Sequence, residues 1–318
     1  MFREIAGQFD RHFISGHLLP SLFFILLNLV LDYTGILSLK LITLLSPLGL
    51  TWGIPLVLTA AMFGGILLSA LNRPIIMFYE GYPLQKLRVF RFLTTRQRRQ
   101  WYKLNNRLNQ LKEQYYALER NQEDQRIKAL ESEITLLQWR ANNLFPPEAE
   151  SVLPTRLGNA IRAFETYATE RYGIDPVILW SRLTPILPDE FSGTVLYVIS
   201  SFNCLINLVL TMHVIGLELL TLPPYQDFRW RLLGAFVSFI ISYCLYRAAI
   251  SRAIDWGYVF NTAFDLYRRD LLKKLGFRPP KDLEKERKLW GKIWDLILYK
   301  HTEDIVFNLE IFEKEEEN

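Results

Sequence analysis

Residue types that build catalytic and metal centres are scarce in this chain. The two cysteines, Cys204 and Cys244, both lie in apolar stretches, so they predict neither a disulfide framework nor a zinc site. The four histidines are scattered, with no pair at the spacing of metal ligands. The short motifs of phosphate-binding loops, dinucleotide-binding folds, serine hydrolases, zinc peptidases and dithiol oxidoreductases are also missing. We therefore expect no metal, no cofactor, no catalytic residue and no enzymatic activity.

Charged residues are missing from four long stretches, although they make up 22% of the whole chain. These charge-free stretches are residues 13–31, 41–72, 191–217 and 232–246. A helix of about 20 apolar residues spans the hydrocarbon of a bilayer. The pattern excludes an ordinary soluble protein and a disordered chain, and it predicts an all-α integral membrane protein with four transmembrane helices. The net charge of +4 is too small to predict a nucleic-acid partner.

The first pair of spans is predicted at about residues 17–37 and 53–71. The first apolar run is too long for a secretory signal and lacks a small-x-small cleavage pattern, so we interpret it as an uncleaved anchor. The stretch before residue 53 contains Pro47 and Gly49, and it either lies in the outer interface or forms a re-entrant turn.

The second pair of spans is predicted at about residues 194–217 and 231–250. The last of the four is the shortest, because residues 232–246 cover only about 22 Å at 1.5 Å per residue. Arg231 and Arg247 would then extend their side chains from its two ends toward the interfaces.

Basic residues concentrate after the second span. The segment that follows contains a single acid, Glu80, and the basic residues Arg73, Lys86, Arg88, Arg91, Arg96, Arg98 and Arg99. Lys and Arg near the ends of spans favour the cytoplasm. We therefore predict a multi-pass protein of the cell inner (plasma) membrane, with both termini cytoplasmic. We predict four regions. Residues 1–72 form an N-terminal cytosolic segment and a first transmembrane hairpin, and residues 73–190 form a cytosolic insertion. Residues 191–250 form a second transmembrane hairpin, and residues 251–318 form a cytosolic helical region.

The cytosolic insertion begins with apolar residues at heptad spacing. They are Leu104, Leu108, Leu111, Tyr115 and Leu118, followed by Ile127, Leu130, Ile134 and Leu137. The phase changes between Leu118 and Ile127, where the chain is polar. This pattern predicts an antiparallel helical hairpin or coiled coil over about residues 103–143, with a continuous helix containing a stutter as the alternative.

Prolines divide the rest of the insertion into short helices. Residues 156–172 form one of them and place Leu157, Ile161, Phe164 and Ala168 on one face. In the C-terminal region, amphipathic segments are expected at 256–275 and 283–299. The second carries Trp290 and Trp294, which either pack on the cytosolic hairpin or lie at the membrane surface. The acidic tail 313–318 is expected to be frayed.

Three motifs in this region resemble a recurrent stretch of other proteins. They are Pro154-Thr155-Arg156-Leu157-Gly158-Asn159, Glu170-Arg171-Tyr172-Gly173-Ile174-Asp175 and Leu179-Trp180-Ser181-Arg182-Leu183. The stretch resembles a family of uncharacterised bacterial four-span inner-membrane proteins of no established activity, and the similarity extends from Arg73 to about Phe277. The resemblance implies a bacterial inner-membrane location and no reaction.

Polar residues inside the spans give the first functional hypothesis. They follow helical spacing, with Ser21, Asn28 and Asp32 on one face of the first span and Ser200, Asn203, Asn207, Thr211 and Glu218 on one face of the third. Burying such groups in lipid is costly, so two aligned stripes with an acidic outer rim predict a water-filled path that favours cations. Because four spans enclose too little room, the hypothesis is a homo-oligomeric channel-like protein with cytosolic hairpins that assemble or gate it.

The alternative hypotheses assign no pore. Asn, Ser and Thr also join helices by hydrogen bonds, and the small residues Ala61, Gly65 and Ser69 suit close helix packing. In a non-conducting scaffold, Arg88, Arg91, Arg96, Arg98 and Arg99 contact anionic lipid or a cytosolic protein partner. The same arginines also fit simple positive-inside topology. A further group of acids and bases is interpreted as solvated or capping pairs. It contains Glu165, Glu170 and Asp175 beside Arg162 and Arg171.

Overall fold

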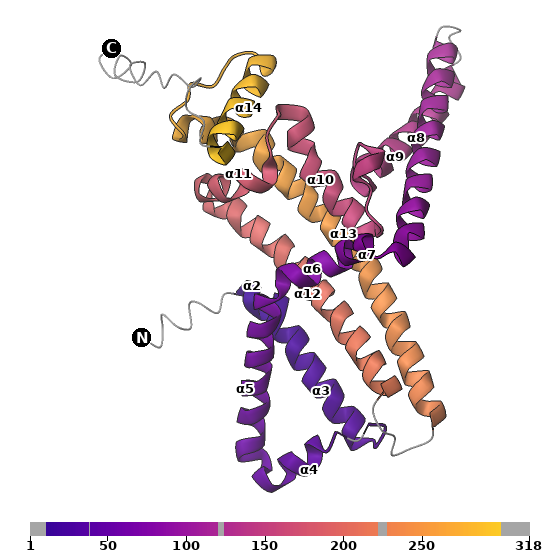
Figure 1. Ribbon diagram of the computed structural model, residues 1–318, viewed down its shortest axis with the longest axis vertical. Helices are drawn as coiled ribbons and strands as arrows, with labels where there is room; N and C mark the ends of the chain where they lie inside the picture. The colour runs from indigo at the N-terminus through magenta and orange to yellow at the C-terminus, as the bar shows by residue number, and fades with distance from the viewer. Residues whose placement is uncertain (1–10, 38, 120–123, 222–227, 300–318) are drawn as a thin grey trace. The chain divides into compact units, whose positions relative to one another are not determined.

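The computed structural model describes residues 11–37, 39–119, 124–221 and 228–299, and every regular element within these ranges is a helix (Figure 1). The all-α expectation is therefore confirmed for this part of the chain. The chain divides into two compact units, Met1–Phe90 with Leu196–Trp256 and Arg91–Val195 with Gly257–Asn318. We call the first the span unit and the second the hairpin unit.

The span unit begins with three helical pieces in direct succession. α2 (Arg11–Phe13), the π-helix η1 (Ile14–Leu18) and α3 (Leu19–Tyr33) together form the first candidate span, Arg11–Tyr33. This span begins and ends earlier than the predicted range 17–37. It ends at Tyr33 because the Asp32 carboxylate accepts the backbone N–H groups of Leu39, Lys40 and Ile42, which turns the chain.

The second candidate span is longer than the predicted range 53–71. It runs over Leu41–Ala70 and contains α4 (Leu41–Leu45), the 3₁₀ helix η2 (Ser46–Leu48) and α5 (Gly49–Ala70). Gly49, whose positive φ of 57° suits a residue without a β carbon, makes the junction between η2 and α5. The stretch before residue 53 is thus helical. α6 (Asn72–Glu80), α7 (Tyr82–Lys86) and η3 (Arg88–Phe90) follow it.

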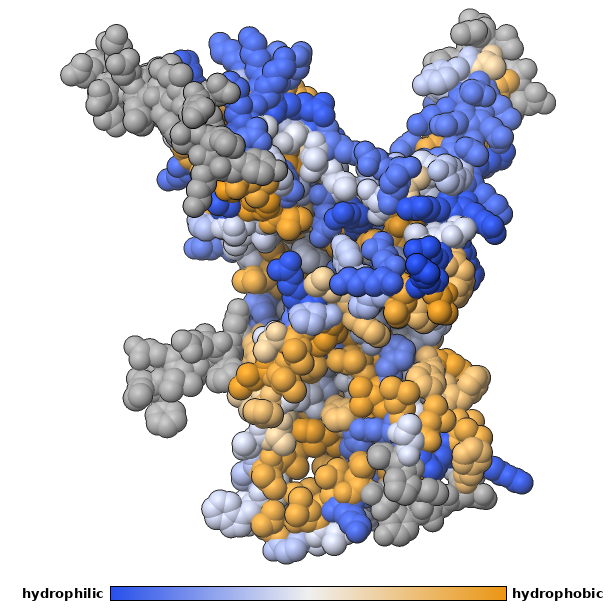
Figure 2. Space-filling model, in the orientation of Figure 1, coloured by the Kyte–Doolittle hydropathy of each residue, from blue (hydrophilic) through white to orange (hydrophobic). Residues whose placement is uncertain are grey.

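The remaining candidate spans are the two longest helices. α12 (Asp189–Thr221) and α13 (Phe228–Lys274) have 33 and 47 residues. α13 joins the predicted span 231–250 and the predicted segment 256–275 into one helix, which extends well beyond the charge-free run 232–246. All four helices are long and apolar enough to cross a membrane, and the surface of the span unit seen in Figure 2 is predominantly hydrophobic.

The hairpin unit contains the antiparallel pair α8 (Arg91–Glu119) and α9 (Asp124–Leu144). At one end Trp101 Nε1 donates to Pro146 O at 2.8 Å, and toward the other end the Tyr115 hydroxyl donates to Glu131 Oε1 at 3.1 Å. Leu108 and Leu111, two of the predicted heptad positions, are buried. These contacts fit the helical-hairpin interpretation and do not fit a continuous helix.

Shorter helices complete this unit. They are η4 (Ala149–Ser151), α10 (Arg156–Tyr172), α11 (Pro176–Leu183), η5 (Thr184–Ile186) and α14 (Leu283–Tyr299). α10 has the predicted bounds, since Thr155 caps its first turn and Gly173 takes a left-handed conformation, φ 72°, after its last residue. Its predicted apolar face, Leu157 to Ala168, is buried.

α14 packs against α10, and this contact accounts for its tryptophans. Trp290 and Ile293 are buried, and Trp294 is half-buried. The tryptophan-bearing face is therefore covered by protein within the hairpin unit, as the packing alternative expected, although the partner is α10 and not the α8–α9 pair. The acidic tail 313–318 lies outside the described residues.

The close approach of α10 to α13 gives a first prediction. A β carbon on Gly257 of α13 would lie 2.8 Å from Cδ1 and 2.9 Å from Cβ of Phe164, a buried ring. Alanine favours a helix over glycine by about 1 kcal/mol, but overpacking costs about 1–3 kcal/mol. We expect Gly257→Ala to lower the unfolding free energy by about 1 kcal/mol, measured by thermal unfolding in detergent.

The matched control is Gly291→Ala in α14, where the added carbon would have no described atom within 4 Å outside its chain neighbours and the adjacent backbone of its own helix. It should leave stability unchanged or raise it by up to about 1 kcal/mol. Equal effects of the two substitutions would contradict the tight contact between Gly257 and Phe164.

Candidate functional site

The polar face of α12 lies against the first helical stretch of the span unit. Asn207 is fully buried, and its Nδ2 donates to the carbonyl of Gly16 at 2.8 Å and lies 3.1 Å from Nδ1 of His17. The side chain of Asn203 packs on Gly16, and Ser200 Oγ pairs with Nδ1 of His12 at 3.2 Å. Asn203 and Asn207 therefore face another helix.

The other polar residues of the predicted path contact different protein groups. Ser21 of α3 is buried against Gly64 of α5, where an added β carbon would overlap the Ser21 hydroxyl. The amide of Asn28 donates to the carbonyl of Phe24 at 3.2 Å and also faces the carboxylate of Glu218. Thr211 is buried in α12. The two predicted stripes thus meet protein along most of their length.

Asp32 acts as a structural cap. Its Oδ1 accepts from the backbone nitrogens of Leu39 and Lys40 at 2.9 and 3.0 Å, and its Oδ2 accepts from Ile42 at 2.8 Å. A carboxylate with three backbone donors is a strong local anchor. The helical spacing did not predict this structural role, and the place of Asp32 on an acidic outer rim stays a prediction.

The predicted lipid or partner contacts are exposed but do not form one patch. Arg96 and Arg99 share a face of α8 with Lys103 and Phe92, around a depression of about 570 Å³. Arg98 turns away and donates to the carbonyl of Glu150 at 3.2 Å. Arg91 begins α8, whereas Arg88 belongs to the span unit, so the arginines divide between the two units.

A polar pocket in the hairpin unit is the most developed candidate site. It has a volume of about 760 Å³ and lies among α8, α9, α10 and α13. Aromatic, amide and charged side chains line it, including Trp101, Asn105, Trp139, Asn142, Asn143, Tyr167, Glu170, Arg171, Tyr258, Asn261, Thr262 and Asp265. Pockets that bind small molecules have this range of volume and this mixture of apolar walls and placed polar groups.

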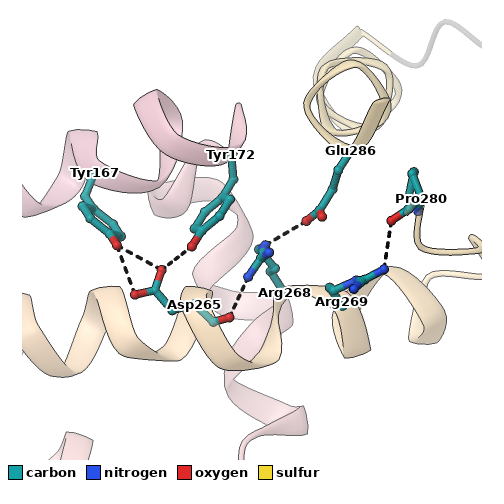
Figure 3. A network of polar contacts seen from close by, with 7 residues as sticks. All are labelled: Tyr167, Tyr172, Asp265, Arg268, Arg269, Pro280 and Glu286. Atoms are coloured by element: carbon teal, nitrogen blue, oxygen red, sulfur yellow. Dashed lines mark hydrogen bonds and ion pairs between the residues drawn. The ribbon is translucent and has the colours of Figure 1, made fainter. Parts of the chain in front are cut away.

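A hydrogen-bond network holds one wall of the pocket (Figure 3). The Asp265 carboxylate of α13 accepts from the hydroxyl of Tyr167, at 3.1 Å to each oxygen, and from that of Tyr172 at 2.6 Å. Arg268, one turn further on, donates to the Asp265 carbonyl at 2.6 Å and forms an ion pair with the buried Glu286 of α14 at 2.8 Å. The network therefore ties α10, α13 and α14 together.

The tyrosines of this network act as hydrogen-bond donors. Burial, followed by the neighbouring Asp265, raises the pKa of Tyr172 to about 12 and also raises the pKa of Tyr167. Both hydroxyls stay protonated at neutral pH and hold the Asp265 carboxylate in place as an acceptor. Burial also raises the pKa of Glu170, and Glu148 adds to this shift. The arrangement suits recognition of a ligand and provides no activated nucleophile.

The acidic and basic residues that the sequence suggested as solvated or capping pairs make short-range contacts in and next to α10. Asp175 caps α11 by accepting from the backbone nitrogen of Ile178 at 3.0 Å, and Arg162 pairs with Glu165 at 3.5 Å. Among the described residues, no group of three His, Cys, Asp or Glu side chains could hold a metal ion. Sequence reasoning missed the pocket because Tyr167 and Asp265 are 98 residues apart. The only local signal was the helical spacing of Tyr258, Asn261 and Asp265.

Comparison of the chain with protein-family models, with curated proteins and with solved structures finds no match.

The raised pKa of Tyr172 predicts a pH dependence of stability. Because the pKa is about 12 in the folded chain and about 10 in an unfolded one, the unfolded chain loses the proton first. The contribution is fully present below pH 10 and is lost as pH rises toward 12. At about 1.4 kcal/mol per pKa unit, the loss is roughly 2–3 kcal/mol. Chemical unfolding at pH 8 to 12 should show a shallower decline for Tyr172→Phe than for wild type.

The control is Tyr116→Phe, at an exposed position of α8. It should keep the wild-type decline. If both variants decline with the same slope, the hydrogen bond between Tyr172 and Asp265 does not govern this pH range.

Proposed function

We propose that this protein is a non-conducting, membrane-anchored binding protein, a scaffold that recruits a cytosolic ligand or partner through its hairpin unit. The observation that carries the proposal is the contrast between the two units. In the span unit, the polar side chains of Asn207, Ser200 and Asp32 bind neighbouring protein groups. In the hairpin unit, polar and aromatic side chains surround a pocket of about 760 Å³.

The proposed location is the inner (plasma) membrane, with the hairpin unit and both termini in the cytoplasm. The positive-inside rule supports this orientation, since Arg and Lys gather after the second and fourth spans. The basic face of α8 with Arg96, Arg99 and Lys103 supports an additional contact with anionic lipid. These three side chains are exposed, and each Lys or Arg near an anionic surface contributes about 1 kcal/mol.

A homo-oligomeric channel is the second candidate, and one observation favours it. Within the described part of the chain, four oxygens of the predicted stripes are buried without a hydrogen-bond partner, namely Asn28 Oδ1, Asn203 Oδ1, Asn207 Oδ1 and Glu218 Oε2. Water in a path between copies would supply the missing donors. The first candidate is preferred because the donor groups of Asn28 and Asn207 already bind protein.

Ion flux separates the two candidates. The purified protein is reconstituted into liposomes loaded with a K⁺-sensitive dye, and gramicidin provides the positive control. We expect no flux above that of empty liposomes, because the polar side chains of α12 are covered by the first helical stretch. Asp32→Asn and Asn207→Leu should not change this result.

The contradicting outcome is wild-type flux that rises with protein density and falls in both variants. Such flux would assign the stripes to a conducting path and would overturn the non-conducting proposal. Circular dichroism of the same proteoliposomes shows whether each variant has kept its helices.

A further inference from the structure

Two side chains of α13 place hydrogen-bond acceptors in the pocket of the hairpin unit. Asn261 and Asp265 lie one turn apart on α13, and both line the pocket. The Oδ1 atom of Asn261 is buried and has no hydrogen-bond partner among the residues that the structure describes. A buried acceptor without a donor is costly, so this position calls for a donor from a bound molecule or water.

The Asp265 carboxylate retains acceptor capacity beside that amide. An ionised carboxylate has about four acceptor positions. Oδ1 accepts from Tyr167 and Tyr172, whereas Oδ2 accepts from Tyr167 alone among the described residues. The two hydroxyls thus fix the carboxylate without saturating it.

The charge of the lining is negative. Its charged side chains are Glu170, Asp265 and Arg171, so acids outnumber bases. The guanidinium of Arg171 lies 5.8 and 5.9 Å from the ring centres of Tyr167 and Tyr172, which places it over the tyrosines of the wall. An anionic ligand would meet the two carboxylates and the amide oxygen of Asn261, whereas a cationic ligand would find hydrogen-bond acceptors.

Aromatic rings form the other walls and are held by hydrogen bonds. Trp139 Nε1 donates to the Tyr258 hydroxyl at 2.6 Å, and Trp101 Nε1 donates to the carbonyl of Pro146 at 2.8 Å. Both indoles line the pocket, and their N–H groups are already engaged. A cation that approaches the face of such a ring is attracted by its π-electrons.

We propose that this pocket binds an elongated organic cation with N–H donors, of the alkylammonium or polyamine class, with one ammonium group between Asn261 and Asp265. The proposal rests on the proposed function, in which the hairpin unit is the binding unit. N–H donors are required because the amide oxygen of Asn261 needs a donor, which a quaternary ammonium lacks. The volume of about 760 Å³ accommodates a chain much longer than a single ammonium group.

Binding is tested with three linear probes of similar length and different charge. Spermidine is the cation, 1,8-octanediol the neutral analogue and suberate the anion. Each is titrated into the full-length protein in non-ionic detergent, by calorimetry and by tryptophan fluorescence, because Trp101 and Trp139 line the site. We expect spermidine to bind with at least tenfold higher affinity than either of the other probes.

Substitutions at Asn261 show whether binding occurs in this pocket. Asn261→Leu should weaken spermidine binding about tenfold, and Asn261→Asp should strengthen it several-fold by adding a carboxylate. Asn109→Asp adds the same charge at an exposed position of α8 outside the pocket and should leave the affinity unchanged. Circular dichroism confirms that the variants are folded, and a gain of affinity in Asn261→Asp cannot arise from misfolding.

The other outcomes overturn the proposed ligand class in different ways. Preferential binding of the diol or of suberate, if sensitive to Asn261, would retain the hairpin unit as the binding unit and exclude a cation. Spermidine binding that is equally strengthened by Asn109→Asp would be a surface charge effect. Absence of binding by all three probes would overturn the ligand class, and K⁺ flux in the liposome assay would additionally overturn the proposed function.

Discussion

The hydrogen bond from Asn207 to the carbonyl of Gly16 is the contact on which the arrangement of the span unit depends. Hydrocarbon offers no hydrogen-bond partner, so a polar side chain inside a span must bind another protein group or water. Asn207 is fully buried and joins α12 to η1, while Ser200 on the same face of α12 pairs with His12 of α2. Asn207 and Ser200, two of the polar residues that suggest a path in the sequence, therefore join α12 to the first helical stretch.

Charge distribution predicted the number of spans because it is a local property of the chain. A run without charged residues needs no knowledge of distant segments, and the same holds for α10, whose start and end are signalled by Thr155 and Gly173. The role of Asp32 was not predictable, since its three backbone partners become neighbours only when the chain turns after Tyr33. The pocket was missed for a similar reason, because Tyr167 and Asp265 meet only through the packing of α10 on α13.

In the hairpin unit, side chains from α10, α13 and α14 hold one wall of the pocket together. The ion pair of Arg268 with buried Glu286 and the hydroxyls of Tyr167 and Tyr172 hold the wall that carries Asp265. Breaking one member of such a buried network leaves its partners unsatisfied, which makes the network costly to disturb. On the proposed topology, this unit presents a preorganised, acceptor-rich pocket to the cytosol while the spans provide the anchor.

Water access to the two units tests this division of roles most directly. In a Cys204→Ala, Cys244→Ala background, single cysteines at Asn203 and at Thr262 are treated with a charged, membrane-impermeant thiol reagent in detergent-free nanodiscs. The account predicts rapid modification of the cysteine at position 262, which lines the pocket and is exposed, and none at position 203, which packs on Gly16. Rapid modification at position 203 would show a water-filled path through the spans and would contradict the account.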